Sequence, residues 1–387
     1  MRSSGHISGR QRRARLGVRH RLAVKAATPE EAAASVVALH GTDPPTVFLS
    51  AGARLAAPGP GPVERALYDD RTLVRMTGMR RTVFVVPAEL VPMVHWSTMA
   101  PVARRERRSL MRTFGEGGWD ETRIAAAEAA VLRALARAGE ASAEELGALV
   151  PELREQVKVA AGKPYEALVS LGSRLLPLMA MDGLLVRGRR AGGTWVSGKH
   201  LWGAAPELPA MAVPEAQAEL ARRWLAAFGP GTEADLKWWT GWTLSEVRRA
   251  VSAVGAVEVE LDEGPGLVLP DDLEEVPEPE PWAALLPALD PTPMGWQSRD
   301  WYLPPEHRAG LFDRNGNVGP TVWWNGRVVG GWAQRPDGEI VWRLLDDVGA
   351  QGRAAVEAEA AGLAAWLGGV RVTPRFRTPL ERELSSP

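Results

Sequence analysis

The polar stretch His40-Gly41-Thr42-Asp43 contains three side chains whose types suit work on a bound water molecule. A neutral imidazole accepts a hydrogen bond from water, a hydroxyl orients water, and a carboxylate offers negative charge to a cationic centre. Each residue also has an ordinary structural interpretation. Asp43 can cap a helix that begins at Pro44, Thr42 can be a turn residue, and His40 can close a preceding helix. The residue types alone leave both interpretations open.

Composition excludes several kinds of site. With 387 residues, of which 45% are hydrophobic, the chain can form two or three packed modules. It has no cysteine, which excludes disulfides and thiolate-bound clusters, and its 6 histidines lack the spacing of a metal site. Neither a nucleotide-binding glycine motif nor an apolar run long enough to span a bilayer is present. We therefore expect no cofactor, no metal and no membrane contact, and the lack of a signal-peptide pattern predicts a cytoplasmic protein.

The net charge of −1 conceals an uneven distribution of charge along the chain. The basic residues from Arg2 to Lys25 occur without an acidic residue among them, whereas the segment from Glu258 to Glu280 is acidic and proline-rich. A local basic face is sufficient for contact with nucleic-acid phosphates. The near-neutral total therefore does not exclude a DNA-binding protein.

Helical patterns with start signals dominate the first part of the chain. Residues 1–12 are expected to form a disordered basic arm. Helices are predicted over 13–27, 29–39 and 44–55, followed by a hydrophobic strand at 82–86. This order is typical of a helix-turn-helix with a displaced wing.

Two later segments repeat an order of three helices and two strands, which is that of a winged helix. In the first, a helix over 122–138 precedes a capping box at Ser142–Glu145, and two short strands flank a glycine-rich turn within 183–198. In the second, which covers 215–269, three helices lead into a strand hairpin. The arginines around the earlier glycine-rich turn are candidates for contact with a DNA groove or backbone. They are Arg187, Arg189 and Arg190.

The last part of the chain changes to strand patterns, and Asn325-Gly326 between two hydrophobic runs indicates a type I′ hairpin. The predicted fold is mainly α with a small β-domain: three tandem winged-helix modules and a C-terminal β-barrel-like domain. The expected parts are winged-helix modules at 13–120, 121–200 and 214–270, an acidic linker at 271–281, a β-rich domain with a closing helix at 282–375, and a tail at 376–387.

The framework motifs DP, ARL, RTLVR, MRRT, KWWTG and LP-LDP resemble those of the YcaQ-like and AlkZ-like winged-helix DNA glycosylases. Aligned on the flanking DP and ARL, the family's catalytic Gln-x-Gln or Gln-x-Asp triplet falls on His40-Gly41-Thr42. The resemblance thus implies that His40 and Thr42, together with Asp43 as the only carboxylate of the turn, are the catalytic candidates.

The resemblance also implies DNA contacts from the arginines near the turn and from the late hairpin. These candidates are Arg54, Arg71, Arg75, Arg80, Arg81, Asn325 and Arg327. They are additional to the three arginines of the second wing. The alternative for the loop arginines is a solvated, salt-bridged loop. Trp238, Trp239 and Trp242 are predicted to pack the core of the third module rather than to stack on bases.

The function that follows from the resemblance is that of a monofunctional DNA glycosylase. It would excise bulky alkylated purines of the N7-alkylguanine type, with interstrand crosslinks as a further substrate, for repair or self-resistance. Its partner would be duplex DNA that carries such purines, and the expected form is a nucleoid-associated monomer. The alternative is a non-catalytic winged-helix DNA-binding protein, such as a regulator or lesion sensor, because the catalytic triplet departs from that of the family.

Overall fold

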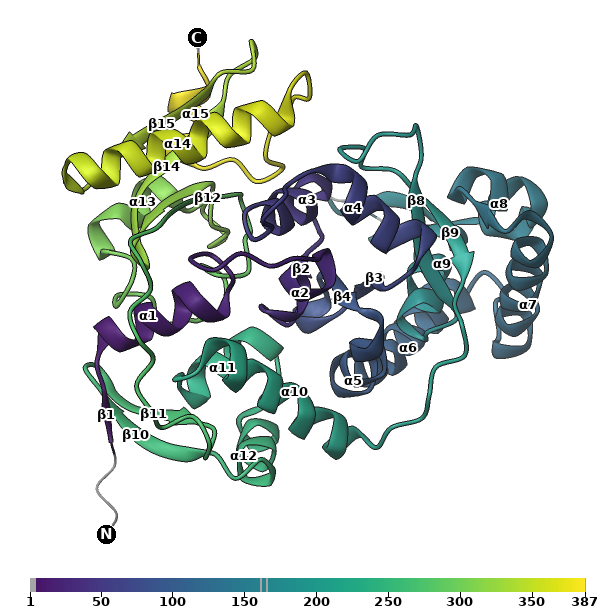
Figure 1. Cartoon of the computed structure of the whole chain (residues 1–387). Helices are drawn as coiled ribbons and strands as arrows, with labels where there is room; N and C mark the ends of the chain where they lie inside the picture. The colour runs from purple at the N-terminus through teal and green to yellow at the C-terminus, as the bar shows by residue number, and fades with distance from the viewer. Residues whose placement is uncertain (1–4, 161, 165, 387) are drawn as a thin grey trace.

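A three-stranded antiparallel sheet with the order β2-β4-β3 lies at the centre of the molecule (Figure 1). The computed structural model describes residues 5–160, 162–164 and 166–386. The strands are β2 (Leu39–His40), β3 (Leu73–Thr77) and β4 (Val83–Pro87), and the helical segments of this first unit are α2 (Pro29–Ala34), α3 (Pro44–Gly52), α4 (Pro60–Glu64) and η1 (Arg65–Asp69). α2 begins where Thr28 Oγ1 accepts a hydrogen bond from the Glu31 N–H. It ends earlier than the pattern predicts because the chain turns to place β2 beside β4.

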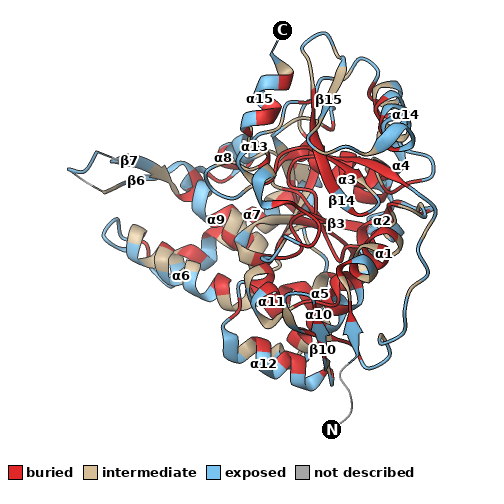
Figure 2. Cartoon of the chain, turned by 90° about the vertical axis from the view of Figure 1, so that its left-hand side faces the viewer, coloured by how far each residue is buried: buried red, intermediate tan, exposed pale blue. Residues whose placement is uncertain are grey.

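A second unit of helices followed by two strands occupies residues 121–204. Its elements are α7 (Glu121–Ala138), β5 (Glu140–Ala141), α8 (Ala143–Leu149), α9 (Leu171–Met181), β8 (Leu185–Arg190) and β9 (His200–Ala204). The predicted capping box is present at α8, where Ser142 and Glu145 exchange side-chain to backbone hydrogen bonds. A hairpin of β6 (Gln156–Val159) and β7 (Ala167–Ser170), which the sequence pattern does not predict, projects from the body of the molecule (Figure 2).

The third unit has the same order of elements. It contains α10 (Val213–Phe228), α11 (Glu233–Thr240), α12 (Leu244–Ala253), β10 (Val257–Leu261) and β11 (Gly264–Val268). In the first two units, the short strand before the second helix pairs with the last strand of the hairpin, which gives the sheet orders β2-β4-β3 and β5-β9-β8. In the third unit, a single bridge between Gly231 and Leu267 takes that place. The three units therefore share one sheet topology.

Further helical segments connect these parts or lie within them. α5 (Val91–Val94) and α6 (Ala100–Gly115) lead from the first unit to the second, and the single-turn segments are η2 (Met79–Arg81), η3 (Ala88–Leu90), η4 (His95–Met99), η5 (Pro151–Arg154) and η6 (Pro305–His307).

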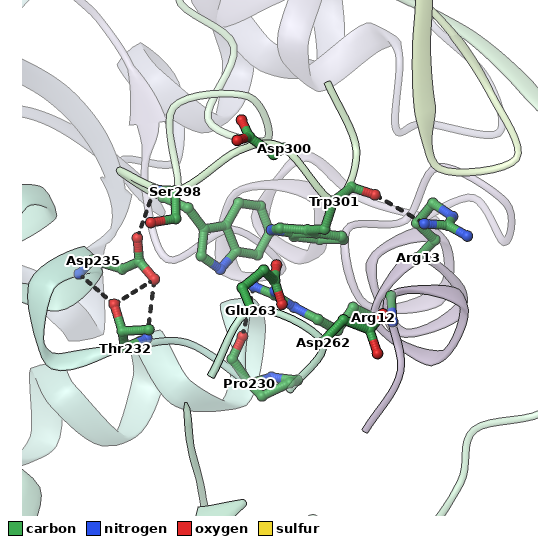
Figure 3. Close-up of polar contacts among 12 residues, drawn as sticks. Arg12, Arg13, Pro230, Thr232, Asp235, Asp262, Glu263, Ser298, Asp300 and Trp301 are labelled. Carbon is green, nitrogen blue, oxygen red and sulfur yellow. Dashed lines mark hydrogen bonds and ion pairs between the residues drawn. The ribbon is translucent and has the colours of Figure 1, made fainter. Parts of the chain in front are cut away.

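The arginines from Arg10 onward belong to the folded structure, so the expected disordered arm is wrong for residues 5–12, and residues 1–4 of that arm lie outside the described residues. β1 (His6–Ile7) pairs in parallel with β10, and α1 (Gly9–Arg19) follows it directly. Figure 3 shows how α1 is fixed against the third unit. The guanidinium of Arg12 lies 4.0 Å from the ring centroid of Trp301 and forms an ion pair with Glu263 at 2.7 Å.

The acidic segment 271–281 is packed against α1 rather than serving as a free linker. Arg15 Nη1 donates to Asp272 Oδ1 at 2.7 Å, and Arg10 forms an ion pair with Glu278. The Gln11 side chain exchanges two hydrogen bonds with the backbone of Val276. Opposite charges far apart in the sequence thus pair with one another, and these contacts hold the acidic segment against α1.

The C-terminal sheet is open, so the barrel-like prediction is wrong. Its four strands have the order β12-β13-β14-β15, and β12 and β15 are not paired with each other. The elements of this part are β12 (Ala283–Leu286), α13 (Arg308–Leu311), β13 (Thr321–Trp324), β14 (Arg327–Gln334), β15 (Ile340–Leu344), α14 (Gly349–Leu367) and α15 (Pro379–Ser385). The predicted Asn325-Gly326 hairpin is present, with φ values of 47° and 80° at its two central residues. The expected frayed tail instead contains α15, whose Leu380 and Leu384 are buried.

One hydrophobic core joins the first unit, the third unit and the C-terminal sheet, whereas the second unit has its own core. Figure 2 shows the buried residues concentrated around α3, β3 and β14. The turn His40–Asp43 therefore lies in the large core, beside strands of the C-terminal sheet.

Arg54 and Asp290 form an ion pair with no exposure to solvent, which contradicts the expected contact of Arg54 with DNA. Two parallel hydrogen bonds of 2.8 Å join the guanidinium and the carboxylate. Arg54 also donates to the Ser50 carbonyl and to Thr292 Oγ1, so both charges are well satisfied. The ARL and LDP motifs are thus the two halves of one structural contact.

Asp290→Asn is expected to destabilise the protein by roughly 3–5 kcal/mol, because it leaves the buried Arg54 guanidinium without its counter-ion. Urea denaturation at neutral pH would measure the change in the free energy of unfolding. Glu339→Gln is the matched control, since it breaks the exposed Arg335–Glu339 pair and should cost less than about 1 kcal/mol. Equal effects of the two substitutions would contradict a structural role for the buried pair.

Candidate active site and nucleic-acid interface

His40 lies on β2, not at a helix end, and is almost completely buried at 5% exposure. Its ring contacts the edge of Phe84 on β4 at a centroid distance of 5.0 Å. Burial, which is the larger cause, and the positive charge of Arg80 together lower the pKa of His40 to about 4. The imidazole is therefore neutral at neutral pH. Its buried Nδ1 has no hydrogen-bond partner among the described residues.

Thr42 lies in the bend between β2 and α3 and is half-buried. The neighbouring Gly41 N–H donates to the Val83 carbonyl at 2.7 Å, which holds the turn against β4. Within the described chain, the Thr42 hydroxyl is buried and has no partner. A buried hydroxyl and a buried ring nitrogen without partners thus lie two residues apart, and each can bond a water molecule.

Asp43 occupies the position before α3, but its side chain makes no capping hydrogen bond. Oδ2 instead accepts a hydrogen bond of 3.0 Å from the backbone N–H of Arg375, at the end of the C-terminal part. Burial raises the pKa of Asp43, while the Arg375 N–H and the charges of Arg375 and Arg190 oppose the rise. The helix-capping interpretation is therefore right about the position of Asp43 and wrong about its contact.

Arg190 on β8 brings positive charge from the second unit to Asp43, a proximity that no sequence pattern indicates. It is 8% exposed, and its Nε and Nη2 atoms are buried without partners among the described residues. Tyr68 of η1 lies beside it: burial raises the Tyr68 pKa, and the Arg190 charge opposes that rise. The turn thus faces two different surroundings, with Arg80 near His40 and with Arg190 and Arg375 near Asp43.

Arg80 and Arg299 both lie against the indole of Trp238. Their guanidinium carbons are 4.2 and 4.8 Å from the ring centroid. Burial lowers the pKa of Arg80, and the like charge of Arg299 lowers it further. No ion pair joins either arginine to a carboxylate within the described residues. Sequence analysis did not single out Arg299. Trp239 and Trp242 are buried in the core, as predicted, and Trp238 is half-buried and packs against that core.

The remaining arginine candidates fall into two groups. Arg71, Arg81 and Arg189 are exposed and form ion pairs with Glu140, Glu106 and Asp69, respectively, as the alternative of a salt-bridged loop predicts. Arg75 on β3 is buried and Arg187 on β8 is half-buried, so the expectation that Arg75 meets a DNA phosphate at the surface is wrong.

The candidate hairpin at Asn325 is positioned by α1. Asn325 and Arg327 are exposed, but Asn325 Oδ1 accepts the Trp282 N–H at 2.9 Å, and Gly326 packs on Arg13. A groove of about 1000 Å³ beside it has both basic and acidic walls. The local charge therefore does not by itself favour a phosphate backbone there.

No cluster of three potential metal ligands occurs in the part of the chain that the structure describes. Nor does any helix within those residues have the length and apolar character needed to cross a membrane.

Similarity to known proteins places this protein in the class of DNA glycosylases. The structure resembles that of the Streptomyces sahachiroi DNA glycosylase AlkZ, with a TM-score of 0.71 and 23% sequence identity, over 96% of this chain and 99% of that one. A search of curated protein sequences finds no significant match. A sequence model described as DNA glycosylase AlkZ-like matches residues 33–366. The chain belongs to the AlkZ-like DNA glycosylase family.

Proposed function

We propose that this protein is a monofunctional glycosylase that excises bulky alkylated purines from duplex DNA, for repair or self-resistance. Alkylation at a ring nitrogen makes the base cationic and a good leaving group. The enzyme then has to stabilise an oxocarbenium-like sugar and position a water molecule. The observation that carries the proposal is the neutral, buried His40 with an Nδ1 that has no partner among the described residues. The resemblance of the flanking motifs aligns this residue with the family's first catalytic glutamine.

In the proposed mechanism, His40 Nδ1 accepts a hydrogen bond from the attacking water, and the Thr42 hydroxyl orients that water. The nearby Arg80 charge keeps the imidazole neutral, and this matters because an imidazolium would oppose a cationic transition state. The Asp43 carboxylate supplies the negative charge that stabilises the sugar, and Arg375 and Arg190 favour its ionised form.

In the proposed binding mode, the three helix-strand units act as winged-helix modules that bind duplex DNA. The protein acts as a nucleoid-associated monomer. The unpaired cations Arg80 and Arg299, which both lie against Trp238, bind phosphates next to the extracted nucleotide. Arg71, Arg81 and Arg189 exchange their carboxylate partners for phosphates when DNA binds. Interstrand crosslinks are a further proposed substrate.

Arg80→Met and Arg299→Met are each expected to weaken duplex binding and to lower the slope of log K against log salt by roughly one for each phosphate that is no longer neutralised. Fluorescence anisotropy over a salt series would measure both quantities. Arg343→Met, which removes an exposed arginine of β15 paired with Glu383, is the control. An unchanged slope in the first two variants would make the pair of arginines structural.

His40→Ala is expected to lower the rate of base release by about 100-fold or more, the usual range for loss of a general base. His40→Gln should retain most of the activity, since an amide can still bond the water. The measurement is single-turnover release of N7-alkylguanine from duplex DNA, followed by alkaline cleavage at the abasic site. If wild-type protein binds duplex DNA well but releases no base, the protein is a non-catalytic DNA-binding protein and the glycosylase proposal is wrong.

The pH profile separates the two titrating groups. The wild-type rate should stay level as pH falls through 6.5, because the pKa of His40 is lowered to about 4, and decline only at lower pH. Arg80→Met should move the decline due to His40 to higher pH, since it removes a charge that disfavours the imidazolium. A decline of the rate at low pH that remains in His40→Gln reports protonation of Asp43, whose pKa is raised by burial. A wild-type midpoint near 6.5 would contradict the buried, neutral imidazole.

Asp43→Asn distinguishes catalysis from structure at the turn. An amide oxygen can still accept the Arg375 N–H, but it carries no negative charge. We expect base release to fall sharply while the melting temperature stays nearly constant. Full activity in this variant would leave Asp43 with a structural role only.

A further inference from the structure

A cavity of about 430 Å³ lies between β3, β8, α5 and the connecting segment 205–209. Its walls are mostly apolar, with side chains such as Leu73, Val91, Leu185 and Leu208. Its volume is that of a site for a small organic molecule. Arg75 and Arg187 also line it, from neighbouring strands of the first and second units.

Arg75 is a buried cation without a counter-ion. It is 3% exposed, and its Nε, Nη1 and Nη2 atoms all lack a hydrogen-bond partner among the described residues. An unpaired buried charge is costly, so a polar or anionic partner is expected beside it. Arg187 adds a second cation: burial lowers its pKa to about 10, and its bond to the Thr77 hydroxyl is long at 3.3 Å.

The acidic residues of the lining do not compensate these charges. Glu140 is occupied by an ion pair with Arg71 and by the backbone N–H of Arg189. Glu89 and Glu207 are exposed to solvent. His95, the other titratable group of the lining, has its pKa lowered by burial. The cavity therefore combines apolar walls with two uncompensated guanidinium groups.

We propose that this cavity binds a small organic anion, whose carboxylate or phosphate group pairs with Arg75 and whose apolar body fills the remaining space. Arginine presents several N–H groups in one plane, which suits such anions. A cationic alkylated purine would be repelled by the same two charges. The site is thus separate from the proposed glycosylase reaction, and the inference does not depend on that reaction.

A ligand in this cavity would also bear on the candidate active site. It would join β3, which follows the catalytic turn in the first unit, to β8, which carries Arg190 near Asp43. Because Arg187 and Arg190 belong to the same strand, an anion between Arg75 and Arg187 would stabilise the position of that strand. The binding site is therefore suited to an effector.

The test uses the full chain and four probes: 1-naphthoate, 1-naphthyl phosphate, inorganic phosphate and the neutral 1-naphthamide. Titration calorimetry and thermal unfolding should show saturable binding and stabilisation with 1-naphthoate or 1-naphthyl phosphate, and much weaker effects with 1-naphthamide and inorganic phosphate. The stronger of the first two identifies the head group as a carboxylate or a phosphate monoester.

Arg75→Met should weaken that binding by about tenfold or more, the effect of losing a hydrogen bond to a charged group. Without ligand it should fold and melt at the same or a higher temperature, because it removes an unpaired buried charge. Arg343→Met, which removes an exposed arginine of β15 paired with Glu383, is the control and should bind the anion like wild type. The proposal is overturned if no anion binds saturably, if the amide binds equally well, if Arg75→Met binds like wild type, or if unmodified duplex DNA displaces the anion.

Discussion

The buried Arg54–Asp290 pair joins the end of α3 to the loop after β12, and the position of the turn His40–Asp43 depends on this junction. α3 begins directly after the turn, and the C-terminal part holds it along its length. At its start, Asp43 accepts the Arg375 N–H, and Thr46 donates to the Ala288 carbonyl at 2.9 Å. At its end, Arg54 forms the buried ion pair with Asp290. A helix held at both ends gives its first residues a defined orientation.

Electrostatic pairing decides which of the many arginines remain available for anions. The basic run of α1 is neutralised by the acidic segment that follows the third unit. Several surface candidates are paired with single carboxylates. Two pairs of buried or half-buried arginines without a carboxylate partner lie at borders between units, Arg80 with Arg299 and Arg75 with Arg187. Both pairs are therefore candidates for anion binding.

The chemistry of the turn depends on burial as much as on residue type. An exposed histidine at the position of the family's glutamine would be partly cationic below neutral pH and unsuited to a cationic transition state. Burial and the neighbouring Arg80 keep it neutral. Next to it, two arginines moderate the effect of burial on the Asp43 carboxyl. One strand-to-helix turn thus holds a neutral acceptor and a carboxylate in distinct environments.

The sequence by itself determined the elements whose signals are local. The capping box at Ser142 and the Asn325-Gly326 hairpin could be predicted because both depend on residues next to one another in the chain. Family motifs also located the turn at His40. The tertiary structure alone decided that Arg54 is buried against a residue 236 positions away, that Arg190 approaches Asp43, and that α1 and α15 are packed rather than free. The physical reason is that burial and ion pairing depend on which segments, far apart in the sequence, pack together. A local sequence pattern contains no information about that packing.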